Sequence, residues 1–136
     1  MTKLKIALQK SGRLSEKSLE LIRECGISLT NGTRKLLSVS SNFPLEVMYL
    51  RDDDIPRYVA DGVADIGIVG ENVVTEERAE VEVLEKLGFA RCRLSLAVPR
   101  SVGYDGPEYF QGRKVATSYP AILDRYFQQR GIKADI

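Results

Sequence analysis

The segment from residue 50 to residue 72, LRDDDIPRYVADGVADIGIVGEN, constrains the fold more than any other part of the chain. It places a charged turn, a short helix, a buried strand and a second turn one after another, and few folds need that order. Asp52 to Asp54 put carboxylates where a helix begins, and Pro56 has the backbone angle tolerated in a first turn. We therefore expect a helix near residues 55–61 that ends at Gly62.

A buried strand is expected directly after this helix. Residues 64–70 read ADIGIVG, a short run rich in Ile and Val. In this run Gly67 permits another part of the backbone to approach closely, and Gly70 lets the chain turn away where the strand ends. Glu71 and Asn72 then follow the carboxyl end of the strand, which is where ligands bind in α/β sheets.

Strand and helix patterns alternate along the rest of the chain, which predicts an α/β fold. The first helix is expected to have Ser15 as its N-cap, to bury Ile22 and Cys25, and to end at Gly26. An Asn31-Gly32 pair predicts a hairpin turn. Strands are expected over residues 3–8, 27–29, 36–39, 45–50, 81–84, 92–99 and 114–118, and further helices near residues 75–79 and over residues 120–129, before Gly131.

Composition excludes several classes of function. The 136 residues carry 20 basic and 19 acidic side chains, so no global charge favours nucleic acid or anionic membrane. Histidine is absent, which removes Ser-His-Asp triads, Cys-His pairs and histidine-bearing zinc sites. Two cysteines and no apolar leader or membrane span favour a reduced, cytoplasmic protein, and Cys92 is expected in the core.

The strongest candidate for chemistry is the junction between the first strand and the first helix. Lys10, Ser11, Gly12 and Arg13 combine two cations with the backbone N–H groups and dipole of a helix N-terminus, which suits phosphate or pyrophosphate. The same pattern also fits an ordinary turn with solvated charges.

Three further groups are weaker candidates. Arg34 and Lys35 beside the hairpin turn form a possible anion clamp, although basic residues often flank turns without binding anything. Arg51 with the three aspartates after it suits phosphate together with magnesium-bound water, and helix capping explains at least one of those carboxylates without a metal. Ser118 precedes a helix, where it either caps the helix or binds an anion.

Five segments taken together resemble the amino-terminal part of the ATP phosphoribosyltransferase family, which opens histidine biosynthesis. The segments are LQKSGRL, SSNFPLEVMYLRDDDIP, GVADIGIVGEN, LGFARCRLSLAVP and KVATSYP. The resemblance implies two α/β lobes of the type II periplasmic-binding-protein kind, with residues 1–94 in the first lobe and 95–136 beginning the second. It also implies transfer of phosphoribosyl from phosphoribosyl pyrophosphate to ATP, with magnesium present and pyrophosphate released.

The resemblance further implies roles for individual residues. Arg13, Arg34 and Lys35 are expected to act on the pyrophosphate group, with Lys10, Ser11 and Gly12 beside them, while Arg51, Gly70, Glu71, Asn72 and Ser118 line the substrate cleft. No residue is assigned to the metal.

The family's phosphoribosyl pyrophosphate loop and the strands that complete the lobes are not found among these residues. We therefore expect this chain to be a truncated piece of the enzyme that is inactive alone, and the complete protein to form homo-oligomers. Two other readings stay open: a module that binds a small anion without turning it over, and a regulatory or assembly subunit of the same fold.

Overall fold

A computed structural model describes residues 2–30 and 36–136, and the chain divides into two compact units, Met1–Arg91 and Cys92–Ile136. Each unit has its own buried cluster of apolar side chains. No helix within the described ranges is long and apolar enough to cross a membrane.

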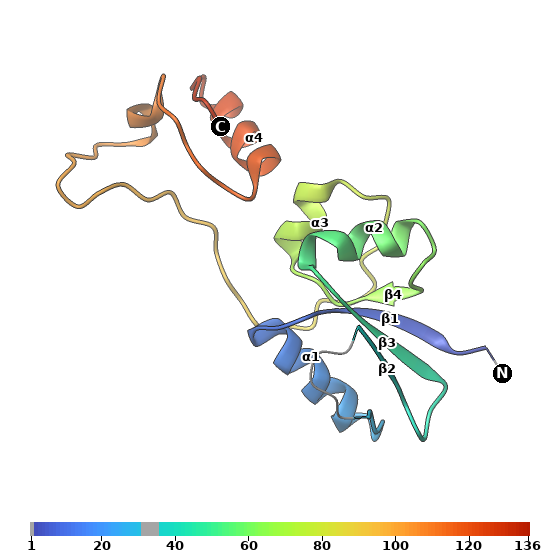
Figure 1. Ribbon diagram of the computed structural model, residues 1–136. Coiled ribbons are helices and arrows are strands. Elements are labelled where there is room, and N and C mark those ends of the chain that lie inside the picture. Colours follow the sequence, from blue (N-terminus) through green and yellow to red (C-terminus); the bar gives the residue numbers. More distant parts are fainter. Residues whose placement is uncertain (1, 31–35) are drawn as a thin grey trace. The chain divides into compact units, whose positions relative to one another are not determined.

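The first unit is built on a four-stranded mixed sheet with the strand order β2-β3-β1-β4 (Figure 1). Strand β1 (Leu4–Gln9) lies in the middle and pairs in parallel with β3 (Leu45–Leu50) on one side and with β4 (Ile66–Gly67) on the other. Strand β2 (Leu37–Val39) pairs antiparallel with β3 at the edge. The predicted α/β fold is therefore confirmed, and the structure adds that its sheet is parallel at the centre.

Helices cover both faces of this sheet because successive side chains of β1 point in opposite directions. Ile6 and Leu8 pack in one cluster with Ile22 of α1 (Arg13–Glu24). Ala7, which lies between them, packs in another cluster with Ile55 of α2. Figure 1 shows α1 on one side of the sheet, with α2 (Ile55–Ala60) and α3 (Glu71–Glu77) on the other.

The expected ends of the first helix are partly wrong. The helix begins at Arg13 with Gly12 in the N-cap position, so Ser15 is no N-cap but a buried residue of the first turn. Ile22 is buried as expected, whereas Cys25 is exposed because it follows the last helical residue. Gly26 has a φ of 79°, which confirms it as the residue at which the chain turns away.

The charged turn and the helix after it are confirmed with one change. Asp52–Asp54 form a short 3₁₀ helix, η1, that leads directly into α2 with Pro56 near its start, and Gly62 follows with a φ of 76°. Within the described residues no aspartate side chain caps α2 itself, so the capping expected there is wrong; Oδ1 of Asp52 instead accepts the N–H of Asp53 in the η1 turn before it.

Several expected strands are absent from the described part of the first unit. Residues 81–84 form no strand, and Val83 and Leu84 are exposed. The strand expected at residues 27–29 is reduced to one antiparallel bridge between Leu29 and Ser40. The predicted Asn31-Gly32 turn lies outside the described residues. Helix α3 begins at Glu71, earlier than the residues 75–79 that were expected.

The second unit is organised around α4 (Pro120–Gln129), which has the bounds expected from the sequence. Leu123 and Phe127 of α4 are buried together with Ile132 and with Phe110 of the 3₁₀ helix η2 (Pro107–Phe110). Gly131 follows α4 with a φ of 68°, as its place in the sequence predicts.

Residues 92–99 do not form the expected strand, and Cys92 is exposed, so its place in the core is wrong. Leu96 and Val98 pack against the buried cluster, but no neighbouring strand pairs with their backbone within the described ranges. The strand expected at residues 114–118 is likewise reduced to one parallel bridge, between Lys114 and Asp135. Both cysteines are free thiols, one in each unit.

Gly67→Ala is expected to destabilise the first unit. A Cβ at this position would lie 2.6 Å from Cγ2 of Ile55, which is completely buried, so α2 would have to move away from β4. Overpacking of this kind costs about 1–3 kcal/mol of the free energy of unfolding, which urea denaturation measures. Gly103→Ala is the control, because a Cβ there meets nothing within 4 Å. Equal unfolding midpoints for the two variants would contradict the role of Gly67.

Candidate functional site

Three parallel strands end at the same edge of the sheet in the first unit. Gln9 of β1 pairs with Leu50 of β3, and the N–H of Lys10 donates to the carbonyl of Leu50 at 2.8 Å. On the other side of β1, the N–H of Ile68 donates to the carbonyl of Ala7 at 3.0 Å. The segments that leave these ends are residues 10–12, 51–54 and 68–70. In open α/β sheets this is the edge at which ligands bind.

The first segment presents positive charge at the start of a helix. Gly12 has a φ of 98°, a backbone conformation that favours glycine, and its carbonyl accepts the N–H of Glu16 at 3.1 Å. No side chain of the described residues caps α1, so with respect to these residues the N–H groups of its first turn are open to an anion. Lys10, Ser11 and Arg13 are exposed around this turn. The turn predicted as an anion site therefore combines exposed cations with the start of a helix.

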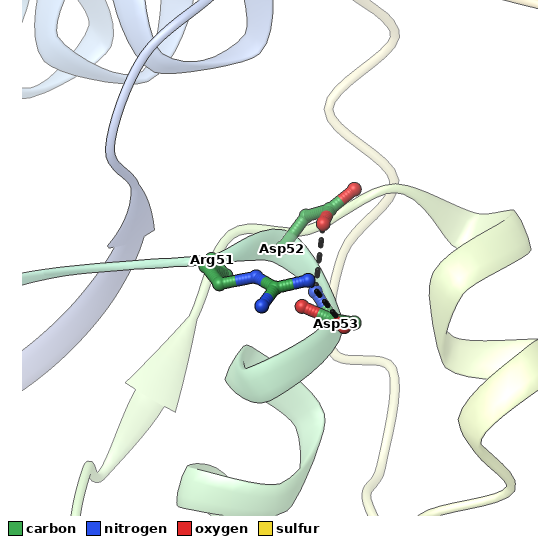
Figure 2. Close-up of polar contacts among 3 residues, drawn as sticks. All are labelled: Arg51, Asp52 and Asp53. Carbon is green, nitrogen blue, oxygen red and sulfur yellow. Dashed lines mark hydrogen bonds and ion pairs between the residues drawn. The ribbon is translucent and has the colours of Figure 1, made fainter. Parts of the chain in front are cut away.

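The second segment holds an arginine and a carboxylate face to face. Figure 2 shows the guanidinium of Arg51 directed toward Asp53, with Nη2 and Oδ2 3.4 Å apart. The N–H of Asp53 donates to Oδ1 of Asp52 at 2.8 Å, which fixes the backbone of the turn. Oδ1 of Asp53 is buried and has no hydrogen-bond partner in the part of the chain that the structure describes. The sequence grouped Arg51 with the three aspartates as a candidate for phosphate and magnesium, and nothing in their spacing indicated the ion pair between Arg51 and Asp53.

The third segment ends in α3 rather than in an extended turn. Gly70 is the N-cap residue, and Glu71 and Asn72 are the first two residues of the helix. Oε1 of Glu71 lies 3.3 Å from Nζ of Lys86, and both side chains are 75% exposed, so this ion pair contributes little to stability. Asn72 is half-buried.

The remaining predicted site residues lie elsewhere or outside the description. Arg34 and Lys35 are not among the described residues. Ser118 belongs to the second unit and is exposed. It does not cap α4, because Oγ1 of Thr117 accepts the N–H of Tyr119 at 2.9 Å and Tyr119 is the N-cap residue. The edge of the sheet therefore gathers all of the predicted positions in the first unit that the structure describes.

Two hollows in the surface of the described residues lie away from this edge. The larger one, about 420 Å³, lies in the second unit beside Tyr109, Phe110, Arg113 and Lys114. The smaller one, about 190 Å³, lies between α1 and Phe89. We give more weight to the strand ends than to either hollow, because charge, open N–H groups and parallel topology coincide there. Among the described residues, no group of three or more His, Cys, Asp or Glu side chains is placed to hold a metal ion.

Comparison with known proteins decides the family. Residues 51–136 match the family model HisG, described as ATP phosphoribosyltransferase. The chain belongs to the ATP phosphoribosyltransferase family. The matched range covers more than half of the chain and includes the Arg51 turn, the start of α3 and the whole second unit.

Individual members of the ATP phosphoribosyltransferase family resemble nearly the whole chain. It is 57% identical over 135 residues to the ATP phosphoribosyltransferase of Cytophaga hutchinsonii, and 53% identical over 133 residues to that of Parabacteroides distasonis. These matches cover 99% and 98% of the chain but 47% of each relative. The chain therefore spans about half the length of the relatives that it matches.

A solved structure agrees in fold. A chain of the ATP phosphoribosyl transferase (HisG:HisZ) complex from Thermotoga maritima matches with a TM-score of 0.67 and 24% sequence identity. The match covers 98% of the present chain and 62% of the Thermotoga maritima chain. At this identity the likeness concerns the α/β fold alone.

Asp53→Asn is expected to change the free energy of unfolding by less than about 1 kcal/mol, because an ion pair whose arginine is 75% exposed is screened by water. Urea denaturation at low and at high salt measures the effect, with Asp54→Asn as the control, since Asp54 makes no ion pair with Arg51 within the described ranges. A loss several times larger would show that the pair stabilises the fold rather than orienting Arg51.

Proposed function

We propose that this chain takes part in the transfer of phosphoribosyl from phosphoribosyl pyrophosphate to ATP, which yields phosphoribosyl-ATP and pyrophosphate and opens histidine biosynthesis. Membership of the family supports the reaction. Lys10, Arg13 and Arg51 all follow strands that end at one edge of the sheet, and this observation supports a role for these individual residues.

The chemistry suits a site made of cations. Substitution at the anomeric carbon of phosphoribosyl pyrophosphate depends on positioning and on neutralising the charge of the leaving pyrophosphate. It needs no protein nucleophile, so a chain without histidine is compatible with it. In this proposal the N-terminus of α1 and Arg13 hold phosphate oxygens, and Arg51 approaches them from the neighbouring strand end.

On the basis of the family resemblance we also propose that Arg34 and Lys35 complete the pyrophosphate clamp with Arg13.

We also propose that the first and second units belong to two lobes of the type II periplasmic-binding-protein kind, and that Ser118 contributes to the substrate site from the second lobe. The division of the chain into Met1–Arg91 and Cys92–Ile136 supports this arrangement.

The aspartates after Arg51 fit a magnesium ion that arrives with its substrate. Mg²⁺ in nucleotide sites keeps several waters and takes one or two carboxylates together with phosphate oxygens. Oδ2 of Asp53 faces Arg51, its Oδ1 is buried, and Oδ1 of Asp52 accepts a backbone N–H. Asp54 is exposed, so we propose that its carboxylate would supply an oxygen ligand to the ion. Bound there, the ion would neutralise phosphate charge.

We further propose a cytoplasmic protein that works as a homo-oligomer. The two exposed, unpaired thiols support a reducing compartment. Strand β2 is an edge of the sheet and Leu37 on it is exposed, which supports association along that edge.

Arg13→Ala is expected to weaken the binding of phosphoribosyl pyrophosphate at least about tenfold, because a charge-assisted hydrogen bond to phosphate contributes about 1.5–3 kcal/mol. Isothermal titration calorimetry measures the dissociation constant. Lys17→Ala is the matched control, since it removes the same charge from the same helix, where Lys17 is paired with Glu20 at 3.6 Å. Equal affinities for the two variants would remove Arg13 from the clamp.

The reaction itself is tested by mixing the chain with ATP, phosphoribosyl pyrophosphate and magnesium and following phosphoribosyl-ATP by ultraviolet absorbance. Product formation would establish the transferase within these 136 residues. Binding of both substrates without product would place the substrate-holding part of the enzyme here. A chain that neither binds nor reacts would contradict the proposed function.

A further inference from the structure

The glycines of this chain fall into two groups. Seven of the ten described glycines have a positive φ, which favours glycine whatever surrounds it. Gly67, Gly70 and Gly103 have ordinary backbone angles. For Gly67 and Gly70, the reason for glycine lies in the space that a side chain would fill, whereas a Cβ on Gly103 would meet nothing within 4 Å.

The space beside Gly70 is taken by a side chain of the ligand edge. A Cβ on Gly70 would lie 2.6 Å from Oδ1 of Asn72 and 3.7 Å from Cγ2 of Val73. The φ of −64° and ψ of 139° at Gly70 suit any residue, so the backbone does not require glycine here. The carboxamide of Asn72 therefore folds back over Gly70 into room that exists only because residue 70 has no side chain.

Asn72 holds this place without a hydrogen bond to hold it. Its side chain is half-buried, no described residue is its hydrogen-bond partner, and neither of its polar atoms is among the buried ones that lack a partner. A carboxamide offers two donors and an acceptor, which water can reach here and a ligand can take over. Groups of this kind at the carboxyl end of a parallel strand are available to a ligand.

We propose that Gly70 is a positioning residue for Asn72: by carrying no side chain, it lets the carboxamide lie over the turn after β4, where it contacts substrate. This inference rests on the proposed function, because the substrate in question is ATP or phosphoribosyl pyrophosphate. It assigns to Gly70 no contact of its own with substrate.

The contrast with Gly67 makes the inference testable. At Gly67 the atoms that a methyl group would meet belong to Ile55 and Val59 of α2, so the fold itself must shift. At Gly70 the atom met is the far end of a side chain that no hydrogen bond restrains, so only Asn72 must move. Gly70→Ala therefore displaces the amide and leaves the fold as it is.

The experiment compares Gly70→Ala, Asn72→Ala and the double variant, with Gly103→Ala as the matched control. The control adds the same methyl group where nothing lies within 4 Å. For whichever of ATP and phosphoribosyl pyrophosphate the unchanged chain binds, calorimetry is expected to show about three- to tenfold weaker binding for each single variant. The double variant is expected to bind no more weakly than Asn72→Ala, and thermal unfolding of Gly70→Ala is expected to match that of the control.

A second readout needs no ligand. The ¹H–¹⁵N resonances of the Asn72 side-chain amide are expected to shift in Gly70→Ala and to stay unchanged in Gly103→Ala. Unshifted resonances, unchanged affinity in Gly70→Ala, or losses that multiply in the double variant would overturn the inference. If the unchanged chain binds neither substrate, the proposed function is what fails, and the amide resonances alone then decide whether Gly70 sets the position of Asn72.

Discussion

Strand β1 is hydrogen-bonded on both sides, and the arrangement of the first unit depends on that double pairing. Because β1 runs parallel to both β3 and β4, the segments that follow these three strands leave the sheet in the same direction. Parallel neighbours need crossover connections, and α1 and α2 supply them on opposite faces. Residues far apart in sequence, such as Arg13, Arg51 and Asn72, are brought to one edge as a result, and no local motif would have done this.

The parts of the fold that sequence predicted well are those decided by local chemistry. Strand β3 and helix α4 have the bounds expected from their patterns, and Gly26, Gly62 and Gly131 end helices with positive φ. The failures have non-local causes. Alternation at residues 92–99 is real, since Leu96 and Val98 pack inward, but a strand also needs a hydrogen-bonded neighbour, which a pattern does not supply. Ser15 had the right side chain for a cap, yet the backbone of Gly12 starts the helix three residues earlier.

The candidate site was predictable in position and not in detail. Lys10 to Arg13, Arg51 and Gly70 to Asn72 were each predicted to follow a strand, and the parallel pairing of β1 with β3 and β4 is what brings these strand ends to one edge. The pairing of Arg51 with Asp53 depends on the 3₁₀ turn, in which the N–H of Asp54 donates to the carbonyl of Arg51 at 3.1 Å. The reason for a glycine at position 70 depends on the conformation of the Asn72 side chain, and the sequence does not predict that conformation.

The two cysteines have a practical consequence. Each unit contains one thiol, both are exposed and unpaired, and the sequence has no others. Two spin labels or a pair of fluorophores can therefore be attached to the native chain without any substitution. Because Cys92 is the first residue of the second unit, the distance between the labels, measured with and without nucleotide, would report on movement at the junction between the units.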